Sequence, residues 1–135
     1  WPTTVRRITD SYGWRTHPIT GIWGFHDGID IAASMGSPIY ATDSGTIVLQ
    51  KFAKLAAKDI VYYYGDNYVF INHHNGIVSF YGHCSARASG IKEGASVQRG
   101  QVIAYVGSKG KSTAAHLHFG VYVNGKAQNP LNYLH

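Results

Sequence analysis

The sequence predicts a mainly β protein, with antiparallel sheets folded into a single domain of 135 residues. Short runs of β-branched and aromatic residues alternate with turn signals rich in Gly, Asn and Asp, the pattern of short strands joined by tight turns. The clearest example is a predicted β-hairpin, in which Tyr68–His73 is followed by Asn75-Gly76 and then by Ile77–His83. The 16 glycines and the aromatic fraction of 13% fit the same class.

Other apolar runs are expected to form the remaining strands, namely Ser37–Thr42, Thr46–Gln50, Gln101–Val106 and His116–Val123. Asn124-Gly125 marks a turn after the last run, and Pro130 ends regular structure. The segment Phe52–Lys58 contains good helix formers but is too short to be a stable helix alone. We therefore expect a loop insertion there with one helical turn.

Charge and composition restrict the classes of partner. The formal net charge is +5, but the basic residues are scattered and form no basic helix, so we expect no nucleic-acid partner. A basic surface also suits an anionic polymer such as bacterial cell wall. The single Cys84 excludes an internal disulfide, and no apolar run approaches the length of a membrane span. Because the chain begins at Trp1, we expect a processed product or a domain excised from a longer protein.

His116 and His118 are the first candidate metal ligands, because residues two apart in a strand project from the same face. Their Cα atoms would lie about 6.5 Å apart, so both imidazoles could reach one metal ion or its water. The alternative is a pair of ordinary histidines on a solvent-exposed face.

His26 and Asp30 are candidate partners for these histidines. In a flat strand they would lie about 13 Å apart, too far to share an ion. Gly28, Ile29 and Ile31 argue against a helix, so we expect a bend at Asp27-Gly28 that brings the two side chains together. The alternative is a polar turn that enters a strand.

The remaining reactive groups narrow the chemistry. Alternation along Ile77–His83 is expected to place Tyr81 and His83 on one face and Cys84 on the other, which favours a buried, inert cysteine over a Cys-His nucleophile pair. Glu93 is the only glutamate, no His-Glu-x-x-His motif exists, and no acidic pair is placed as in a glycosidase. Histidine is therefore the leading acid–base candidate for a hydrolytic reaction.

Several ordered blocks together resemble the lysostaphin/LytM-type zinc endopeptidases, which cut the peptide part of bacterial peptidoglycan. The resemblance runs from Ile8 to Leu134. The matching blocks are Tyr12–Pro18, His26–Ala33, Gly36–Ala41 with Gly45 as a hairpin, Tyr81-Gly82-His83, His116-Leu117-His118-Phe119 and Asn129-Pro130-Leu131.

The resemblance implies one zinc ion per domain, held by His26, Asp30 and His118, with His83 and His116 acting on water and the transition state. Three protein ligands and one open position are typical of catalytic zinc. Residues 1–135 would then form a monomeric endopeptidase domain that hydrolyses stem or cross-bridge peptides of peptidoglycan, outside the cell or at the cell wall. The sequence leaves open which histidine is the base and which bond is cut.

Three departures from the family pattern are evident. Gly120 stands where the family often has Glu, and Cys84 replaces a commoner Leu. The segment from Phe52 to Asn67 is longer than in short members, and we expect it to form a wall of the substrate cleft. The alternative is a surface excursion whose tyrosines, Tyr62 to Tyr64, begin the next strand.

The resemblance also leaves an alternative function, that of an inactive relative that binds cell wall or a partner protein. All three implied ligands and both accessory histidines are present, which favours an active enzyme. A zinc-stabilised binding module usually needs a fourth protein ligand, and the sequence suggests none.

Overall fold

The structure, a computed structural model, describes residues 1–16, 21–49, 57–112 and 114–134. The described strands are β1 (Ile8–Asp10), β2 (Gly13–Thr16), β3 (Trp23–His26), β4 (Ile29–Ala32), β5 (Pro38–Tyr40), β6 (Gly45–Val48), β7 (Val69–Asn72), β8 (Ile77–Gly82), β9 (Ala86–Arg87), β10 (Ser96–Val97), β11 (Val102–Tyr105), β12 (His116–Val123) and β13 (Lys126–Gln128). The described helices are α1 (Ala57–Tyr64) and the short 3₁₀ helix η1 (Pro130–Asn132). Neither helix is long and apolar enough to span a membrane.

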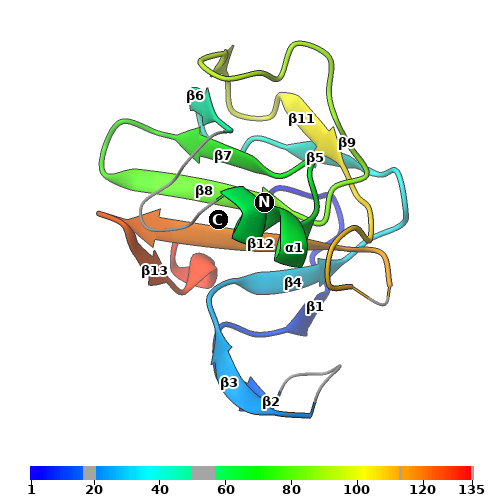
Figure 1. Cartoon of the computed structure of the whole chain (residues 1–135). Coiled ribbons are helices and arrows are strands. Elements are labelled where there is room, and N and C mark those ends of the chain that lie inside the picture. The colour runs from blue at the N-terminus through cyan, green and yellow to red at the C-terminus, as the bar shows by residue number, and fades with distance from the viewer. Residues whose placement is uncertain (17–20, 50–56, 113, 135) are drawn as a thin grey trace.

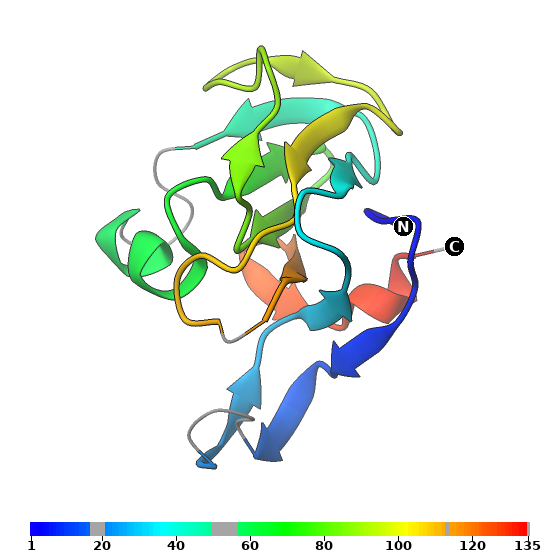
Figure 2. The same ribbon diagram turned by 90° about the vertical axis from the view of Figure 1, so that its right-hand side faces the viewer.

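A long antiparallel sheet dominates the described part of the chain, in the order β1-β4-β12-β8-β7-β6-β10, with β13 paired to β12 (Figure 1). A smaller sheet has the order β5-β11-β9, and β2 pairs with β3. The β2–β3 hairpin extends away from the rest of the molecule (Figure 2). The mainly β, antiparallel class predicted from the sequence is therefore confirmed.

Local patterns identified some of the pairing correctly. The predicted hairpin is formed by β7 and β8, and the last apolar run coincides with β12. The hairpin expected at Gly36–Ala41 and Gly45 is wrong, because β5 pairs with β11 whereas β6 pairs with β7 and β10. The intervening turn instead carries the chain from one sheet to the other, so that Ile39 and Ile47 both enter the core.

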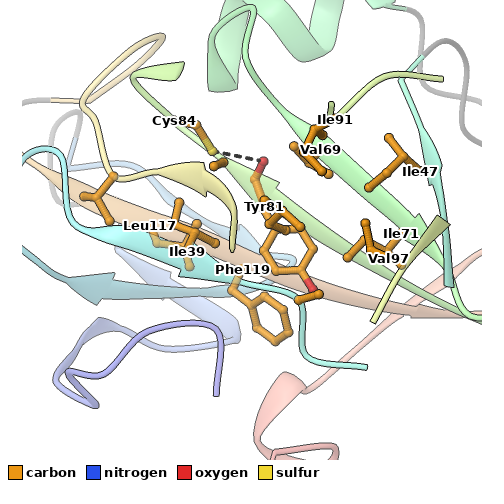
Figure 3. Close-up of a cluster of buried hydrophobic side chains, with 14 of the residues drawn as sticks. Ile39, Ile47, Val69, Ile71, Tyr81, Cys84, Ile91, Val97, Leu117 and Phe119 are labelled. Carbon is orange, nitrogen blue, oxygen red and sulfur yellow. Dashed lines mark hydrogen bonds between the residues drawn. The ribbon is translucent and has the colours of Figure 1, made fainter. Parts of the chain in front are cut away.

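The main core lies on one face of the long sheet (Figure 3). Alternation along β12 sends Leu117, Phe119 and Val121 into this core, where each is at most 2% exposed. His116 and His118 consequently project from the other face of the same strand. The burial of one face thus determines which residues are available on the other.

A second, mainly aromatic cluster occupies that other face and lies under α1. It contains Ile60, Tyr68, Phe70, Phe80 and Tyr122, with Tyr64 packed against it. The helix therefore covers this face of the sheet near β8 and β12 (Figure 1), and its Tyr64 ring stacks on His118.

The C-terminal end of α1 is fixed by backbone hydrogen bonds. The carbonyls of Tyr63 and Tyr64, which a helix end would leave unpaired, accept from the N–H groups of Lys111 and His83 at 2.9 and 2.7 Å. Gly65, at φ 82°, ends the helix in the left-handed conformation.

The helix excludes part of the alternative for this segment, because Tyr62–Tyr64 belong to α1 and do not begin the next strand. Most of the helical turn expected in Phe52–Lys58 lies outside the described residues, as do the last two residues of the Tyr12–Pro18 block.

Tyr81 and Cys84 lie together in the main core, and both are fully buried (Figure 3). The expectation that Tyr81 shares a face with His83 is therefore wrong. β8 ends at Gly82, and His83 adopts a left-handed φ of 66°, which breaks the strand alternation. Cys84 is nevertheless directed away from His83, as expected, with its thiol 3.7 Å from the Tyr81 carbonyl oxygen.

The bend between β3 and β4 requires glycine because of close packing. A Cβ at Gly28 would lie 2.5 Å from the Phe119 carbonyl oxygen and 2.9 Å from the His118 ring. The φ of Gly28 is not positive, so the conformational freedom assumed from the sequence is not the reason.

We predict that Gly28→Ala destabilises the fold by about 1–3 kcal/mol, the usual cost of overpacking. Chemical denaturation monitored by circular dichroism would measure the change. Gly24→Ala is the matched control, because Gly24 lies in β3 with nothing within 4 Å of its added Cβ. Equal stability of the Gly28→Ala protein and the parent would contradict the close approach.

Cys84 should not react with thiol reagents in the folded protein. Its side chain is fully buried, and burial raises the pKa of the thiol to about 12. A chromogenic disulfide reagent should label one thiol in denaturant and almost none under native conditions. Rapid labelling of the native protein would show that the site opens easily.

Candidate metal centre

The paired strands β4 and β12 place two of the candidate ligands, Asp30 and His118, opposite each other. His118 of β12 is registered with Asp30 of β4, and the His118 Nδ1 lies 3.1 Å from the Asp30 Oδ1. His26, at the end of β3, returns across the Asp27-Gly28 bend. Its Nε2 lies 3.2 Å from the His118 Nδ1 and 3.4 Å from the Asp30 Oδ1. The structure therefore brings together the three residues implied by the resemblance.

The spacing of these three atoms fits a zinc ion. In a tetrahedral site with bonds of about 2.0–2.1 Å, neighbouring ligand atoms stand about 3.3–3.4 Å apart. The three observed separations, 3.1, 3.2 and 3.4 Å, are close to that value. Two imidazole nitrogens and a carboxylate oxygen are also the donor types that zinc prefers.

The electrostatics of the cluster also favour a cation. Burial alone would raise the pKa of Asp30, but the imidazoles of His118 and His26 beside it hold it well below its usual value. Burial likewise disfavours a charged His118, yet the carboxylates of Asp27 and Asp30 outweigh that effect and raise its pKa to about 9. These carboxylates surround a fully buried imidazole, and this arrangement stabilises positive charge.

The outer nitrogen of His26 is fixed by the backbone. Its Nδ1 lies 3.0 Å from the Ser11 carbonyl oxygen, which can only accept, so Nδ1 carries the proton and Nε2 has its lone pair free. Asp10 lies 3.7 Å from the same Nδ1 and is held by Arg15 at 3.0 Å.

The outer nitrogen of His118 is directed at a second carboxylate. The His118 Nε2 lies 3.4 Å from the Asp27 Oδ1. Asp27 also accepts hydrogen bonds from Tyr64, at 3.4 Å, and from Tyr122, at 3.2 Å. Burial opposes the Asp27 charge, but the bond from His118 and its neighbours lower the pKa of the carboxyl to about 2. The Tyr64 ring stacks on His118 at a centroid distance of 4.5 Å.

His116 and His83 lie side by side next to these ligands, with ring centroids 4.5 Å apart. The His116 Nδ1 donates to the Ala114 carbonyl oxygen at 2.9 Å, and its Nε2 lies 3.6 Å from the Asp30 Oδ2. The His83 Nδ1 donates to the Lys109 carbonyl oxygen. Burial lowers the pKa of His83 to about 4, so both its charge state and its tautomer leave Nε2 as an acceptor at neutral pH.

The cluster lies in a cleft of about 1020 Å³. One wall includes Phe25 of the β2–β3 hairpin, and the other includes Ile60, Tyr63 and Tyr64 of α1. The described part of the Phe52–Asn67 segment therefore does line the cleft. Lys58, the one lysine of that segment in the part of the chain that the structure describes, is exposed.

Sequence reasoning missed the residues that surround the ligands. Asp27 was treated only as part of a bend, although it stands between two implied ligands. Tyr122 lies four residues after His118 in the same strand, and strand alternation therefore predicts that the two side chains share a face. No local pattern indicates Tyr64, because α1 reaches the site only through the tertiary fold.

Comparisons with known proteins show the family to which the chain belongs. Residues 24–130 match the profile of peptidase family M23. The chain is 40% identical over 131 residues to DD-carboxypeptidase/endopeptidase Mpg of Neisseria meningitidis serogroup B, covering 97% of this chain but 28% of that protein. It is 33% identical over 128 residues to lysostaphin of Staphylococcus staphylolyticus, covering 91% of this chain and 25% of that protein. The chain thus spans about a quarter of the length of these relatives.

Solved structures extend the similarity to the fold. A zinc-containing peptidase from Vibrio cholerae superimposes with a TM-score of 0.79 at 32% identity, over 96% of this chain and 37% of that chain. The catalytic domain of lysostaphin from Staphylococcus simulans gives a TM-score of 0.73 at 31% identity, over 94% of this chain and 90% of that chain. The chain is therefore a lysostaphin-type member of peptidase family M23.

Proposed function

We propose that this domain is a zinc-dependent endopeptidase that hydrolyses peptide bonds in the stem or cross-bridge peptides of bacterial peptidoglycan. The observation that carries the proposal is the triangle of His26, Asp30 and His118 donor atoms at the bottom of an open cleft. The names of the relatives, which include a peptidoglycan DD-endopeptidase of Vibrio cholerae, support this substrate class. Such a substrate would place the domain outside the cell or at the cell wall.

The three ligands would leave one position of a tetrahedral ion open towards the cleft. Zinc, when bound, would polarise the scissile carbonyl and make water a nucleophile at neutral pH. The chain itself must hold the peptide in the cleft and accept a proton from the attacking water.

His116 is the better placed proton acceptor. Its Nδ1 proton is committed to the Ala114 carbonyl, so its Nε2 presents a lone pair 3.6 Å from the ligand Asp30. His83 lies beside His116 and is held neutral by burial, so it offers a second acceptor next to the first. We assign His116 as the general base and His83 as the group that positions water or the leaving amine.

The walls of the cleft suit an extended peptide. Phe25 on one side and Tyr63 on the other offer flat aromatic contact surface, and the Tyr63 hydroxyl adds a polar group. Arg15 and Lys111 also line the cleft, and they could contact carboxylates of an acidic peptide.

Zinc removal provides the first test. Incubation with a chelator should abolish release of new amino termini from purified cell wall, and added zinc should restore it. Asp30→Ala should lose both metal and rate. Full hydrolysis by a sample shown to be metal-free would refute the scheme, and tight zinc binding without any hydrolysis would favour the inactive wall-binding alternative.

A second test separates ligand from base. His116→Ala should retain near-stoichiometric zinc and lose about 10²–10⁴-fold in turnover, the usual contribution of an acid–base group. His118→Ala should lose the metal instead. Metal analysis of the two purified variants distinguishes them, and the opposite pattern would mean that the two roles are exchanged.

A further inference from the structure

We propose that Asp27 is a positioning residue for the metal centre: its carboxylate holds the Nε2 proton of His118 and thereby presents the His118 Nδ1 lone pair to the ion. This role rests on the zinc site of the proposed function, but it concerns metal affinity and not hydrolysis. Its test is therefore independent of whether the domain cuts peptidoglycan.

The first observation is that the His118 ring is enclosed. Its side chain is 2% exposed, and its Nε2 is a buried nitrogen with no hydrogen-bond partner in the described part of the chain. The Asp27 Oδ1, 3.4 Å away, is the acceptor that faces it. A buried imidazole N–H without an acceptor would cost about 1–3 kcal/mol, so the Asp27 carboxylate is what allows Nε2 to keep a proton when Nδ1 binds the ion.

The second observation is that the two carboxylates lie on different sides of the ring. The Asp30 Oδ1 lies 3.1 Å from the His118 Nδ1, whereas the Asp27 Oδ1 faces Nε2. A neutral imidazole has one proton, and Asp27 stabilises it at the nitrogen that faces away from the ligand triangle. Carboxylates that accept from a metal-binding histidine in this way fix its tautomer and raise its basicity as a ligand.

The third observation is that Asp27 is itself held in place. Tyr122 donates to its Oδ2 and Tyr64 to its Oδ1, so both carboxylate oxygens are occupied. The tyrosine ring of Tyr64 also stacks on the imidazole that Asp27 orients.

The test measures zinc affinity by competition with a chelating dye. Asp27→Ala should weaken zinc binding by about 10–100-fold, the usual effect of removing such a partner. Asp27→Asn keeps an acceptor of the same shape without the charge and should fall between Asp27→Ala and the parent. Asp59→Asn is the matched control, because it removes one negative charge from the cleft wall, where Asp59 is exposed, and should leave the affinity unchanged.

A spectroscopic measurement separates positioning from a general structural role. In the zinc-loaded parent, ¹⁵N–¹H correlation spectra should show a proton on the His118 Nε2, shifted downfield by the bond to the carboxylate. Asp27→Asn should move that resonance upfield while the thermal unfolding of the metal-free protein stays near that of the parent. Tyr122→Phe, which leaves the carboxylate in place, should cause a smaller shift in the same direction.

The outcomes distinguish this inference from the proposed function. Parent-like zinc affinity in both Asp27 variants, or an unchanged Nε2 resonance, would overturn the positioning role. A parent protein that takes up no zinc would overturn it together with the metal site. Weakened zinc binding in a domain that releases no peptide from cell wall would leave the inference standing and refute only the proposed hydrolysis.

Discussion

The pairing register between β12 and β4 is the constraint on which the rest of the site depends. It sets His118 opposite Asp30, and it does so because Leu117, Phe119 and Val121 fill the core on the other face. A shift of one residue would turn those apolar side chains into the cleft and the histidines into the core. The geometry of the candidate metal centre is therefore fixed by the burial of Leu117, Phe119 and Val121 on the opposite face of the sheet.

Two irregular points of the backbone complete this arrangement. Gly28 allows the His118 ring and the Phe119 carbonyl to approach the bend, which brings His26 back towards Asp30. His83 leaves the strand in a left-handed conformation that places its ring beside His116, a backbone cost of about 1–3 kcal/mol for such a residue. The N–H of His83 bonds to the end of α1, so the helix that walls the cleft also supports the conformation of a residue within it.

The parts of the structure that could be predicted from the sequence are those that depend on local sequence patterns. Asn75-Gly76 predicts the β7–β8 hairpin, and the spacing of His116 and His118 places both on one strand face. The sheet that receives β5, the helix over Tyr62–Tyr64 and the position of Tyr81 were missed. Each of these features depends either on contacts with residues far away in the chain or on a single residue with positive φ. Neither of these causes produces a periodic pattern in the sequence. The same holds for Asp27, whose role appears only when Tyr64 and Tyr122 reach it.

The four histidines of the cleft differ in how firmly their tautomers are set. His26, His83 and His116 each direct Nδ1 at a backbone carbonyl, of Ser11, Lys109 and Ala114 respectively. These acceptors are backbone carbonyls, so substituting the side chain of Ser11, Lys109 or Ala114 leaves them in place. Such a substitution therefore does not easily change which nitrogen of the histidine carries the proton. His118 faces a side chain instead, and that side chain carries a charge. Substitution of Asp27 therefore changes the surroundings of His118 in the candidate metal centre without altering His26, Asp30 or His118 themselves.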